Sequence, residues 1–566
     1  MDKSLWRQRK VEKARKHKKS IITVMVIIIQ MIFCIIAGNA KQGFFCDEIY
    51  SYGLSNSENY TFIDPETARQ YSDTGWVDKQ YFEDYIQVSK DLPFSFHAVF
   101  ENQKRDVHPP LYYCFLHLLS LLNHGVFTKW TGLALNFILL FFTDLTILSI
   151  SDYLLKDRRL SCIALLFWTF SGAGLSNILF IRMYVMLTFE MLAYVAVHIQ
   201  ILKKQKADLK DCLLMLLTVA CGGLTHYYFY LFVCFFSAPV CLYWLLHKNL
   251  KKLFFYAGNL CAGVGIALCT FPSTIDHILH GYRGTEVIDN LTHGRGEEVM
   301  KTYLKMIDNS IFAGIFKICL GFVVLMIIGG VLLKYFVNFK WKYNQKTRMI
   351  QIDLTRKRNV NYGNIHIFLG NERILEMLFV LSYGLFALTA IKGSGIVHNR
   401  YLYPIYPAAA IVIIQIFSGL LKVFLHSVRT QYLVIFIISI VLDIGSLSKY
   451  GIDFQYMGYH EIAKQAEAFR ETDCLLYYGD GWLDIYTGFP LRMLHKNTYF
   501  MRPGEIGRTA EILSGRETYN SLTVCLPAAY SEEDTRELLD SIAMQTGFTN
   551  YGMIYRYEYL QEWWIE

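Results

Sequence analysis

The sequence predicts a polytopic α-helical membrane protein that ends in a small α/β domain. Of the 566 residues, 53% are hydrophobic, and the mean hydropathy is positive. Apolar runs of about 20 residues, the length needed to cross roughly 30 Å of hydrocarbon, recur along the chain. After about residue 450 these runs stop, and short polar and apolar stretches alternate.

The basic residues predict a membrane topology. Only 18% of the residues are charged, with a net charge of +7. Lys and Arg cluster in short segments between the apolar runs, which is the pattern that keeps such segments in the cytoplasm. Nucleic-acid binding would instead require a basic face on a folded domain. We therefore expect a lipid bilayer, and no nucleic acid, among the partners.

The N-terminal segment 1–20 is rich in Lys and Arg and precedes an apolar run at 21–37. The basic flank predicts a cytoplasmic N-terminus. Because no clear Ala-x-Ala-like cleavage site follows, we expect a retained anchor rather than a signal peptide. Residues 41–109, which contain no spanning run, then form a long first extracytoplasmic loop whose length is typical of a functional segment.

The short apolar stretch 110–122 decides the remaining topology. At about a dozen residues it is too short to span, so we expect it to lie in the interface or to be re-entrant. The basic segments 156–159, 203–206 and 247–252 then all fall in the cytoplasm, whereas a spanning stretch would place them outside.

This topology predicts about eleven spans. They are expected near 21–37, 129–153, 160–179, 183–202, 210–226, 228–246, 253–271, 310–333, 374–391, 403–422 and 430–447. The module 21–450 then contains an outer loop at 272–308 and a basic cytoplasmic loop at 334–373. Residues 451–566 form the extracytoplasmic α/β domain.

The C-terminal domain shows short apolar strand patterns at Cys474–Tyr478 and Leu522–Leu526, and Ser531 followed by acids predicts a helix start. It has no glycine-rich phosphate loop, so we do not expect the catalytic residues there. Cys474 and Cys525 either form a disulfide in an oxidising compartment or remain buried thiols. No Cys-x-x-Cys pair predicts a structural zinc site.

Four polar groups fall at outer ends of separate spans or in outer loops. They are Asp47–Glu48, His108, Arg182–Tyr184 with Thr225–Tyr228, and His398–Tyr401. Singly, each has an ordinary explanation as a solvated turn, a snorkelling cation or an interfacial aromatic. On one surface, they suit transfer from a membrane-embedded phosphate donor. Arginines neutralise a leaving phosphate, and a carboxylate takes the proton of an attacking hydroxyl.

The order of these motifs resembles a known family. Asp-Glu after the first span, His-Pro-Pro-Leu-Tyr-Tyr at 108–113, Arg-Met-Tyr at 182–184, Thr-His-Tyr-Tyr at 225–228 and Arg-Tyr-Leu-Tyr-Pro-Ile-Tyr-Pro at 400–407 are similar to the bacterial relatives of protein O-mannosyltransferases and of the lipid A aminoarabinose transferase. The resemblance covers about residues 20–420. It implies the C-type glycosyltransferase fold and a polyprenyl-phosphate sugar as donor.

The resemblance also implies roles for individual residues. Asp47 would be the catalytic base, and Glu48 would help to position the acceptor or a metal. The residues implied to bind the donor phosphate or to line the cavity are His108, Arg182, Tyr184, His226, Tyr227, Arg400 and Tyr401.

Metal use is left open by one departure from the family pattern. Many relatives carry an acid two positions before the arginine of Arg-Met-Tyr, where this chain has Phe180. Either the arginines alone neutralise the phosphate, or Glu286 or Asp289 of the outer loop replaces the acid. A divalent metal, if one takes part, would be held by Asp47 and Glu48.

The resulting hypothesis is an inverting glycosyltransferase in a bacterial plasma membrane that moves a sugar from a polyprenyl-phosphate carrier to a hydroxyl acceptor in the cell envelope. One alternative is a transporter or lipid flippase, for which Asp144 inside a predicted span is the best indication. The other is a non-enzymatic scaffold or sensor that binds its ligand or partner through the C-terminal domain.

Overall fold

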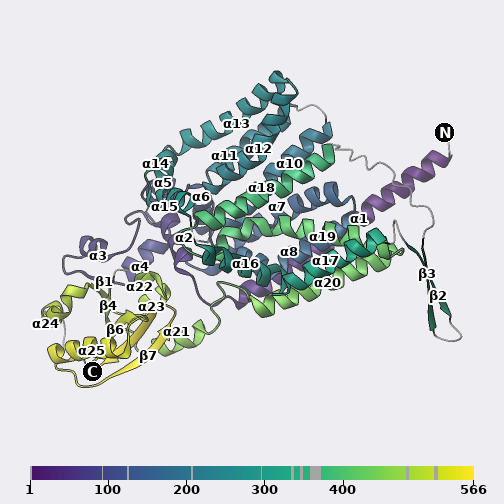
Figure 1. Ribbon diagram of the computed structural model, residues 1–566. Coiled ribbons are helices and arrows are strands. Elements are labelled where there is room, and N and C mark those ends of the chain that lie inside the picture. The colour runs from purple at the N-terminus through teal and green to yellow at the C-terminus, as the bar shows by residue number, and fades with distance from the viewer. Residues whose placement is uncertain are drawn as a thin grey trace.

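The computed structural model combines a large helical body with a small sheet domain at one end (Figure 1). The structure describes residues 3–91, 93–123, 126–204, 208–294, 296–332, 337–344, 349–356, 371–479, 483–514 and 520–566. Of the predicted basic loop 334–373, only 337–344, 349–356 and 371–373 are described, so Lys346, Arg348, Lys357 and Arg358 lie outside the described residues. Lys206 of the predicted basic segment 203–206 also lies outside them.

Eight helices of the described chain are long and apolar enough to cross a membrane. They are α1 (Lys3–Ala40), α7 (Lys129–Leu155), α10 (Tyr184–Lys204), α12 (Tyr228–Leu246), α13 (Leu250–Thr270), α18 (Asn371–Gly393), α19 (Tyr406–Phe424) with the preceding 3₁₀ turn η2 (Asn399–Ile405), and α20 (Val428–Lys449). Their outward faces carry many exposed apolar side chains, as expected where lipid replaces water. The chain is therefore a multi-pass membrane protein.

Two further spans are bent. Helices α8 (Arg158–Thr169) and α9 (Gly172–Leu179) meet at 69°, and α16 (Glu297–Phe312) and α17 (Phe316–Val331) meet at 68°. Ser171 caps the second helix of the first pair by accepting a hydrogen bond from Gly174 N. Counting each pair once gives ten spans. The eleventh expected span is α11 (Leu209–Gly223), whose 15 residues reach only about 22 Å along the helix axis.

The two ends of the helical body differ. The N-terminus and the hairpin of β2 (Val337–Asn344) and β3 (Met349–Arg356) lie at one end, and the C-terminal domain lies at the other (Figure 1). The segment 334–373, which we expected to be a loop, thus contains an antiparallel hairpin. Apolar residues at alternate positions, such as Phe339, Trp341 and Tyr343, are typical of a strand.

The first loop folds between these helices and the sheet domain. It contains α2 (Cys46–Asn56), α3 (Pro65–Tyr71), β1 (Trp76–Asp78), α4 (Lys79–Ile86) and α5 (Phe96–Arg105). The stretch that we expected not to span is α6 (Leu111–Leu122), a short apolar helix. Between α13 and α16, the outer loop forms α14 (Ser273–Leu279) and α15 (Tyr282–His293).

The C-terminal domain is the predicted small α/β unit. Its sheet has the strand order β1-β5-β4-β6-β8-β7. The elements are α21 (Tyr459–Glu467), β4 (Asp473–Tyr477), α22 (Leu483–Tyr486), α23 (Phe489–Arg492), β5 (Asn497–Met501), η3 (Pro503–Arg508), α24 (Thr509–Leu513), β6 (Leu522–Pro527), α25 (Glu532–Thr546), β7 (Tyr551–Tyr557) and β8 (Leu560–Ile565). Strands β4, β5 and β6 are parallel, and β8 and β7 continue the sheet antiparallel. The predicted N-cap at Ser531 is confirmed.

The sheet is completed by the first loop. Strand β1 pairs antiparallel with β5, so that Trp76 lies opposite Tyr499. Phe82 of α4 also packs on Phe489 and Phe500 of the C-terminal domain. One apolar core therefore runs from the helical body through the first loop into the sheet domain, which fixes the domain against the face of the helical body where the site lies.

Candidate functional site

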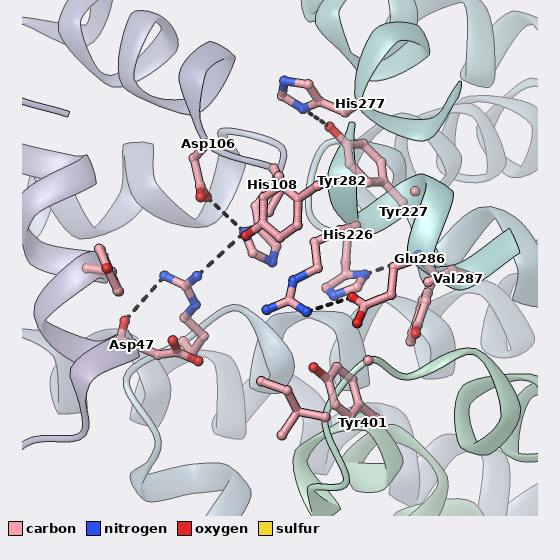
Figure 2. A pocket seen from close by; sticks show the side chains of 18 of the residues that line it. Asp47, Asp106, His108, His226, Tyr227, His277, Tyr282, Glu286, Val287 and Tyr401 are labelled. Atoms are coloured by element: carbon pink, nitrogen blue, oxygen red, sulfur yellow. Dashed lines mark hydrogen bonds and ion pairs between the residues drawn. The ribbon is translucent and has the colours of Figure 1, made fainter. Parts of the chain in front are cut away.

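A cavity of about 770 Å³ opens where the first loop, the outer loop and the C-terminal domain meet the helical body. Eight of the nine residues singled out from the sequence line it, namely Asp47, His108, Arg182, Tyr184, His226, Tyr227, Arg400 and Tyr401. Glu48 does not. The wall combines cationic, acidic and aromatic side chains, several of which appear in Figure 2.

Asp47 lies in the first turn of α2, where the exposed N–H groups of a helix favour a negative charge. Its carboxylate forms an ion pair with Arg400 of η2. Burial raises the pKa of Asp47, but Arg400 and Arg182 outweigh burial and hold the pKa below its usual value. Asp47 is therefore ionised and electrostatically bound to a neighbouring span.

Arg182 lies at the bend between α9 and α10. Its Nη1 donates to the Asp47 carbonyl oxygen at 3.2 Å and to Ser51 Oγ at 3.3 Å. Its guanidinium also lies over the Tyr113 ring at 5.5 Å. These contacts hold a second cation beside Asp47.

Glu48 points away from the cavity and organises the backbone. It is fully buried and accepts hydrogen bonds from Lys41 Nζ at 2.8 Å, Phe45 N at 2.8 Å and Ile181 N at 2.9 Å. Ile181 directly precedes Arg182. Glu48 therefore links the start of α2 to the segment that carries Arg182, and its geometry suits a positioning role.

His108 is paired with Asp106, an acid that was not predicted as a site residue. Its Nδ1 donates to Asp106 Oδ2 at 2.8 Å. Burial raises the pKa of Asp106, but His108 and Arg182 outweigh burial and hold that pKa below its usual value. Burial also lowers the pKa of His108, despite Asp106. Asp106 thus adds a second ionised carboxylate to the cavity wall, beside Asp47.

Aromatic and imidazole rings form the next part of the wall. Tyr184 lies 5.7 Å from His226 and 6.1 Å from Tyr401, measured between ring centroids. Burial, reinforced by nearby cations, lowers the pKa of His226 well below its usual value, so this ring is neutral. Tyr227 is hydrogen-bonded to His277 Nδ1 at 2.7 Å (Figure 2).

Helix α15 of the outer loop contributes a further arginine. Arg283 Nη1 donates to Glu286 Oε2 at 2.7 Å, and both line the cavity. The Glu286 carboxylate occupies space that the absence of a side chain at Gly395 leaves free, since a Cβ there would lie 2.1 Å from Oε1. Glu286 and Asp289 were the two candidates for the acid that relatives carry at the position of Phe180. Glu286 lines the cavity, whereas Asp289 is exposed and pairs with His293.

The C-terminal domain supplies Tyr478, Ile485 and Tyr486 to the cavity wall. The Tyr486 ring lies 4.2 Å from the Tyr50 ring, and its hydroxyl accepts a hydrogen bond from Ile63 N at 2.7 Å. These contacts could not be predicted from the sequence, because they depend on how the domain packs against the first loop.

Asp47 and Glu48, the pair considered for a divalent metal, do not face one another. Asp47 binds Arg400, while both oxygens of Glu48 are occupied by Lys41 and backbone N–H groups. This arrangement does not fit a metal shared by the two carboxylates. Asp144, the acid that favoured a transporter, accepts a hydrogen bond from Gln30 at 2.8 Å and does not line the cavity.

Comparisons with known proteins yield structural likenesses. No protein-family model and no curated protein matches the chain. ArnT from Cupriavidus metallidurans bound to undecaprenyl phosphate aligns over 96% of this chain and 97% of its own, with a TM-score of 0.52 and 9% identity. The chain has the fold of ArnT.

The apo state of ArnT aligns with a TM-score of 0.44 and 10% identity over 91% of this chain and 95% of its own. The archaeal oligosaccharyltransferase AglB from Archaeoglobus fulgidus, in complex with an inhibitory peptide and a dolichol-phosphate, gives a TM-score of 0.40 and 11% identity over 89% of this chain and 69% of its own. The likeness to ArnT confirms the C-type glycosyltransferase fold that the motif order implied.

Proposed function

We propose that this protein is a membrane glycosyltransferase that moves a sugar from a polyprenyl-phosphate carrier to a hydroxyl of an acceptor. The observation that carries the proposal is the convergence of Asp47, Arg182 and Arg400 on one cavity. A carboxylate beside two arginines supplies both a base for the attacking hydroxyl and positive charge for the leaving phosphate. The ArnT fold supports this, since ArnT was solved with undecaprenyl phosphate.

The proposed reaction is a single displacement with inversion. The acceptor oxygen attacks the anomeric carbon, the bond from that carbon to the phosphate oxygen breaks, and its electron pair leaves with the phosphate. Asp47 takes the hydroxyl proton. The products are the glycosylated acceptor and the free polyprenyl phosphate.

The ion pair between Asp47 and Arg400 gives donor binding a role in activating the base. In the structure, the arginines hold the pKa of Asp47 low, which makes the carboxylate a weak base. A donor phosphate that binds Arg400 weakens this stabilisation and adds negative charge nearby. Both changes raise the Asp47 pKa, so that the carboxylate becomes a stronger base when the donor is in place.

The proposed site faces the extracytoplasmic side of a bacterial plasma membrane. The C-terminal domain lies at the opposite end of the helical body from the N-terminus and the β2–β3 hairpin (Figure 1). Both of the latter belong to Lys- and Arg-rich segments, which favour the cytoplasm. The donor lipid would then enter from the bilayer, and the acceptor from the envelope side.

The test is substitution of Asp47→Asn in the full chain. We expect sugar transfer to fall about 100- to 10,000-fold, the range for loss of a general base, with membrane insertion unchanged. Mass spectrometry of envelope glycans and lipids, with and without the protein, identifies the product to be assayed. Asp73→Asn, an exposed acid of the same loop, is the control.

Full activity of Asp47→Asn would overturn the assignment of the base. If His108→Ala then lost activity, the base would be the His108–Asp106 pair. Transport in vesicles without sugar transfer would instead favour the transporter or flippase alternative, which the structural likeness does not favour. Loss of all function on deletion of residues 452–566, with Asp47 dispensable, would favour the scaffold or sensor.

A further inference from the structure

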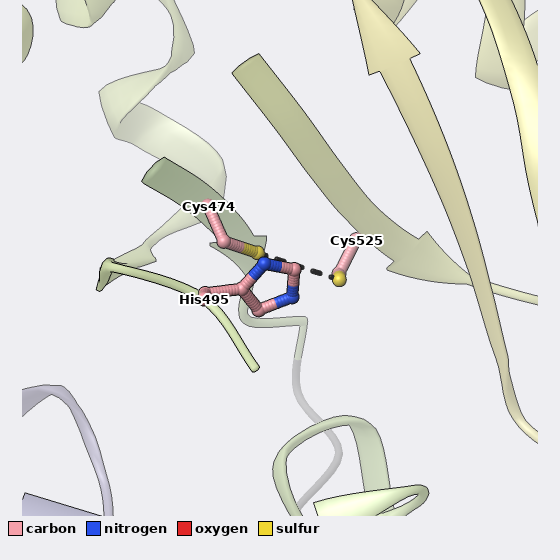
Figure 3. Close-up of side chains that lie close together, drawn as sticks. All are labelled: Cys474, His495 and Cys525. Carbon is pink, nitrogen blue, oxygen red and sulfur yellow. Dashed lines mark hydrogen bonds between the residues drawn. The ribbon is translucent and has the colours of Figure 1, made fainter. Parts of the chain in front are cut away.

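Three side chains with metal-binding atoms converge inside the C-terminal domain. Cys474 lies on β4, Cys525 lies on the neighbouring strand β6, and His495 lies between α23 and β5 (Figure 3). Their ligand atoms all lie within 4.8 Å of one another, and all three residues are buried. No other group of three or more His, Cys, Asp or Glu in the described chain meets this geometry. None of the three lines the cavity.

The two sulfur atoms lie at a distance that suits a shared metal ion. Cys474 and Cys525 are free thiols with their sulfurs 3.5 Å apart. Two thiolates bound to one Zn²⁺ at about 2.3 Å with a tetrahedral angle would be about 3.8 Å apart. Only small side-chain shifts separate the observed positions from this geometry, whereas a disulfide requires the sulfurs to approach to about 2.05 Å.

We propose that Cys474, Cys525 and His495 bind a thiophilic divalent cation, with Zn²⁺ as the expected ion. Each thiol releases its proton to solvent and forms a bond from sulfur to the metal. The imidazole releases any proton on its coordinating nitrogen to solvent and donates the lone pair of that nitrogen. Two sulfurs and one imidazole are typical zinc ligands. The inference concerns the C-terminal domain and does not depend on glycosyl transfer.

His495 has the carboxylate partner that metal-binding histidines usually have. Its Nε2 lies 3.2 Å from Glu562 Oε1, and Glu562 is fully buried. A carboxylate this close to the outer ring nitrogen favours the tautomer that carries its proton there. The remaining nitrogen, Nδ1, is then the one available for coordination; it lies 3.4 Å from the Thr523 hydroxyl.

The charge of Arg492 is compatible with a bound dication. This buried arginine donates from Nη1 to Cys525 Sγ and from Nη2 to Glu562 Oε2 at 3.0 Å. Its charge is balanced by Glu562, so two thiolates and one Zn²⁺ leave the cluster neutral. Neutrality matters here because an uncompensated buried charge is strongly destabilising. The N–H group directed at sulfur also stabilises a thiolate.

A metal at this position would join three parts of the domain. It would tie β4 to β6 and both strands to the segment before β5. This domain also supplies Tyr478 and Tyr486 to the cavity wall. The inferred site is therefore structural, and it would hold the domain that forms one side of the proposed acceptor entrance.

The test begins with metal analysis of the full-length protein purified without chelator. We expect about one zinc per chain, as for other structural zinc sites, and loss of that zinc in the Cys474→Ser/Cys525→Ser variant. Cys269→Ser, at the exposed end of α13, should retain the wild-type content. Equal zinc in the double variant and the wild type would overturn the inference.

A second measurement avoids the need for the variant to fold. Wild-type protein is stripped with a chelator and titrated with Co²⁺, for which we expect a thiolate-to-cobalt charge-transfer band and the intense visible bands of tetrahedral cobalt. Absence of stoichiometric zinc together with absence of these bands would overturn the inference. So would a Cys474–Cys525 disulfide identified by mass spectrometry in the protein as purified.

Discussion

Asp47 and Arg400 form an ion pair across 353 residues of sequence. The pair joins the first turn of α2 to η2, and only 14% of the Asp47 side chain and 8% of the Arg400 side chain are exposed. A phosphate that binds Arg400 must therefore compete with Asp47. This one contact therefore couples the two proposed roles, in which Arg400 stabilises the charge of the leaving phosphate and Asp47 removes the proton of the acceptor hydroxyl.

This contact predicts a shift of the pH dependence in Arg400→Gln. Burial raises the Asp47 pKa and the arginines lower it, with a net value below the usual one. The ionised base is present above this pKa, so activity is lost only when the pH falls through it. Without Arg400, burial has more influence and the pKa rises. We expect the acid limb of the kcat/KM profile to move to higher pH, together with a lower maximum.

The control for this profile is Arg69→Gln, a substitution of a half-exposed arginine that pairs with Glu505. It should leave the acid limb in place. An acid limb that stays at the wild-type position in Arg400→Gln, whatever the maximum rate, would show that Asp47 is not the titrating base.

Glu48 has a different predicted effect, on stability. Its side chain and that of Lys41 are both fully buried, so Glu48→Gln leaves a buried ammonium without its counter-charge. Removing one partner of a buried ion pair costs about 3–5 kcal/mol. We expect a clearly lower melting temperature in detergent.

Two comparison variants make this stability prediction specific. Glu83→Gln breaks the exposed pair with Lys79, which should change the free energy of unfolding by less than about 0.5 kcal/mol. Lys41→Met combined with Glu48→Gln removes both charges and should regain part of the loss. The same melting temperature for Glu48→Gln and Glu83→Gln would contradict the positioning role.

The sequence allowed the membrane fold and most of the cavity to be predicted because both depend on local patterns. The length of an apolar run defines a span, and the basic segments assign the ends of the spans to one side of the membrane. These two patterns placed Asp47, Arg182 and Arg400 on the same surface. The bend between α16 and α17 and the shortness of α11 could not be predicted in this way. Where a helix breaks or ends early depends on its tertiary packing.

The orientation of Glu48 could not be predicted for a simpler reason. Successive residues of an α-helix point about 100° apart, so adjacent acids at a helix start face different surroundings. Without the exact start of α2, nothing in Asp-Glu says which acid faces the cavity. Asp106, Arg283 and Tyr486 were missed because their roles arise from the packing of the first loop, the outer loop and the C-terminal domain against one another.

The contact of Tyr486 with Tyr50 predicts that the C-terminal domain affects acceptor use. Tyr486→Ala removes a ring 4.2 Å from Tyr50 and the hydroxyl that accepts from Ile63 N. Aromatic pairs contribute about 0.5–1.5 kcal/mol beyond area burial, so we expect kcat/KM for the acceptor to fall roughly 2- to 10-fold. Donor binding, measured separately, should change little.

Tyr486→Phe keeps the ring and should retain most of the activity of the wild type. An equal loss of acceptor kcat/KM in Tyr486→Ala and Tyr486→Phe would assign that loss to the hydrogen bond of the Tyr486 hydroxyl alone. A loss of donor binding in Tyr486→Ala would contradict the expectation that the C-terminal domain acts on the acceptor side.

Arg283 and Glu286 predict effects of opposite sign on donor binding. Arg283 lies in the cavity wall, and its guanidinium forms an ion pair with the Glu286 carboxylate at 2.7 Å. Since a hydrogen bond to a charged group contributes about 1.5–3 kcal/mol, Arg283→Ala should raise the KM of the lipid-phosphate donor by roughly 10-fold or more. Glu286→Gln removes the competing carboxylate and should lower that KM. Steady-state kinetics at varied donor concentration measures both. Loss of turnover in Glu286→Gln at saturating donor would contradict this account and place Glu286 in the chemical step, as the acid that Phe180 does not supply.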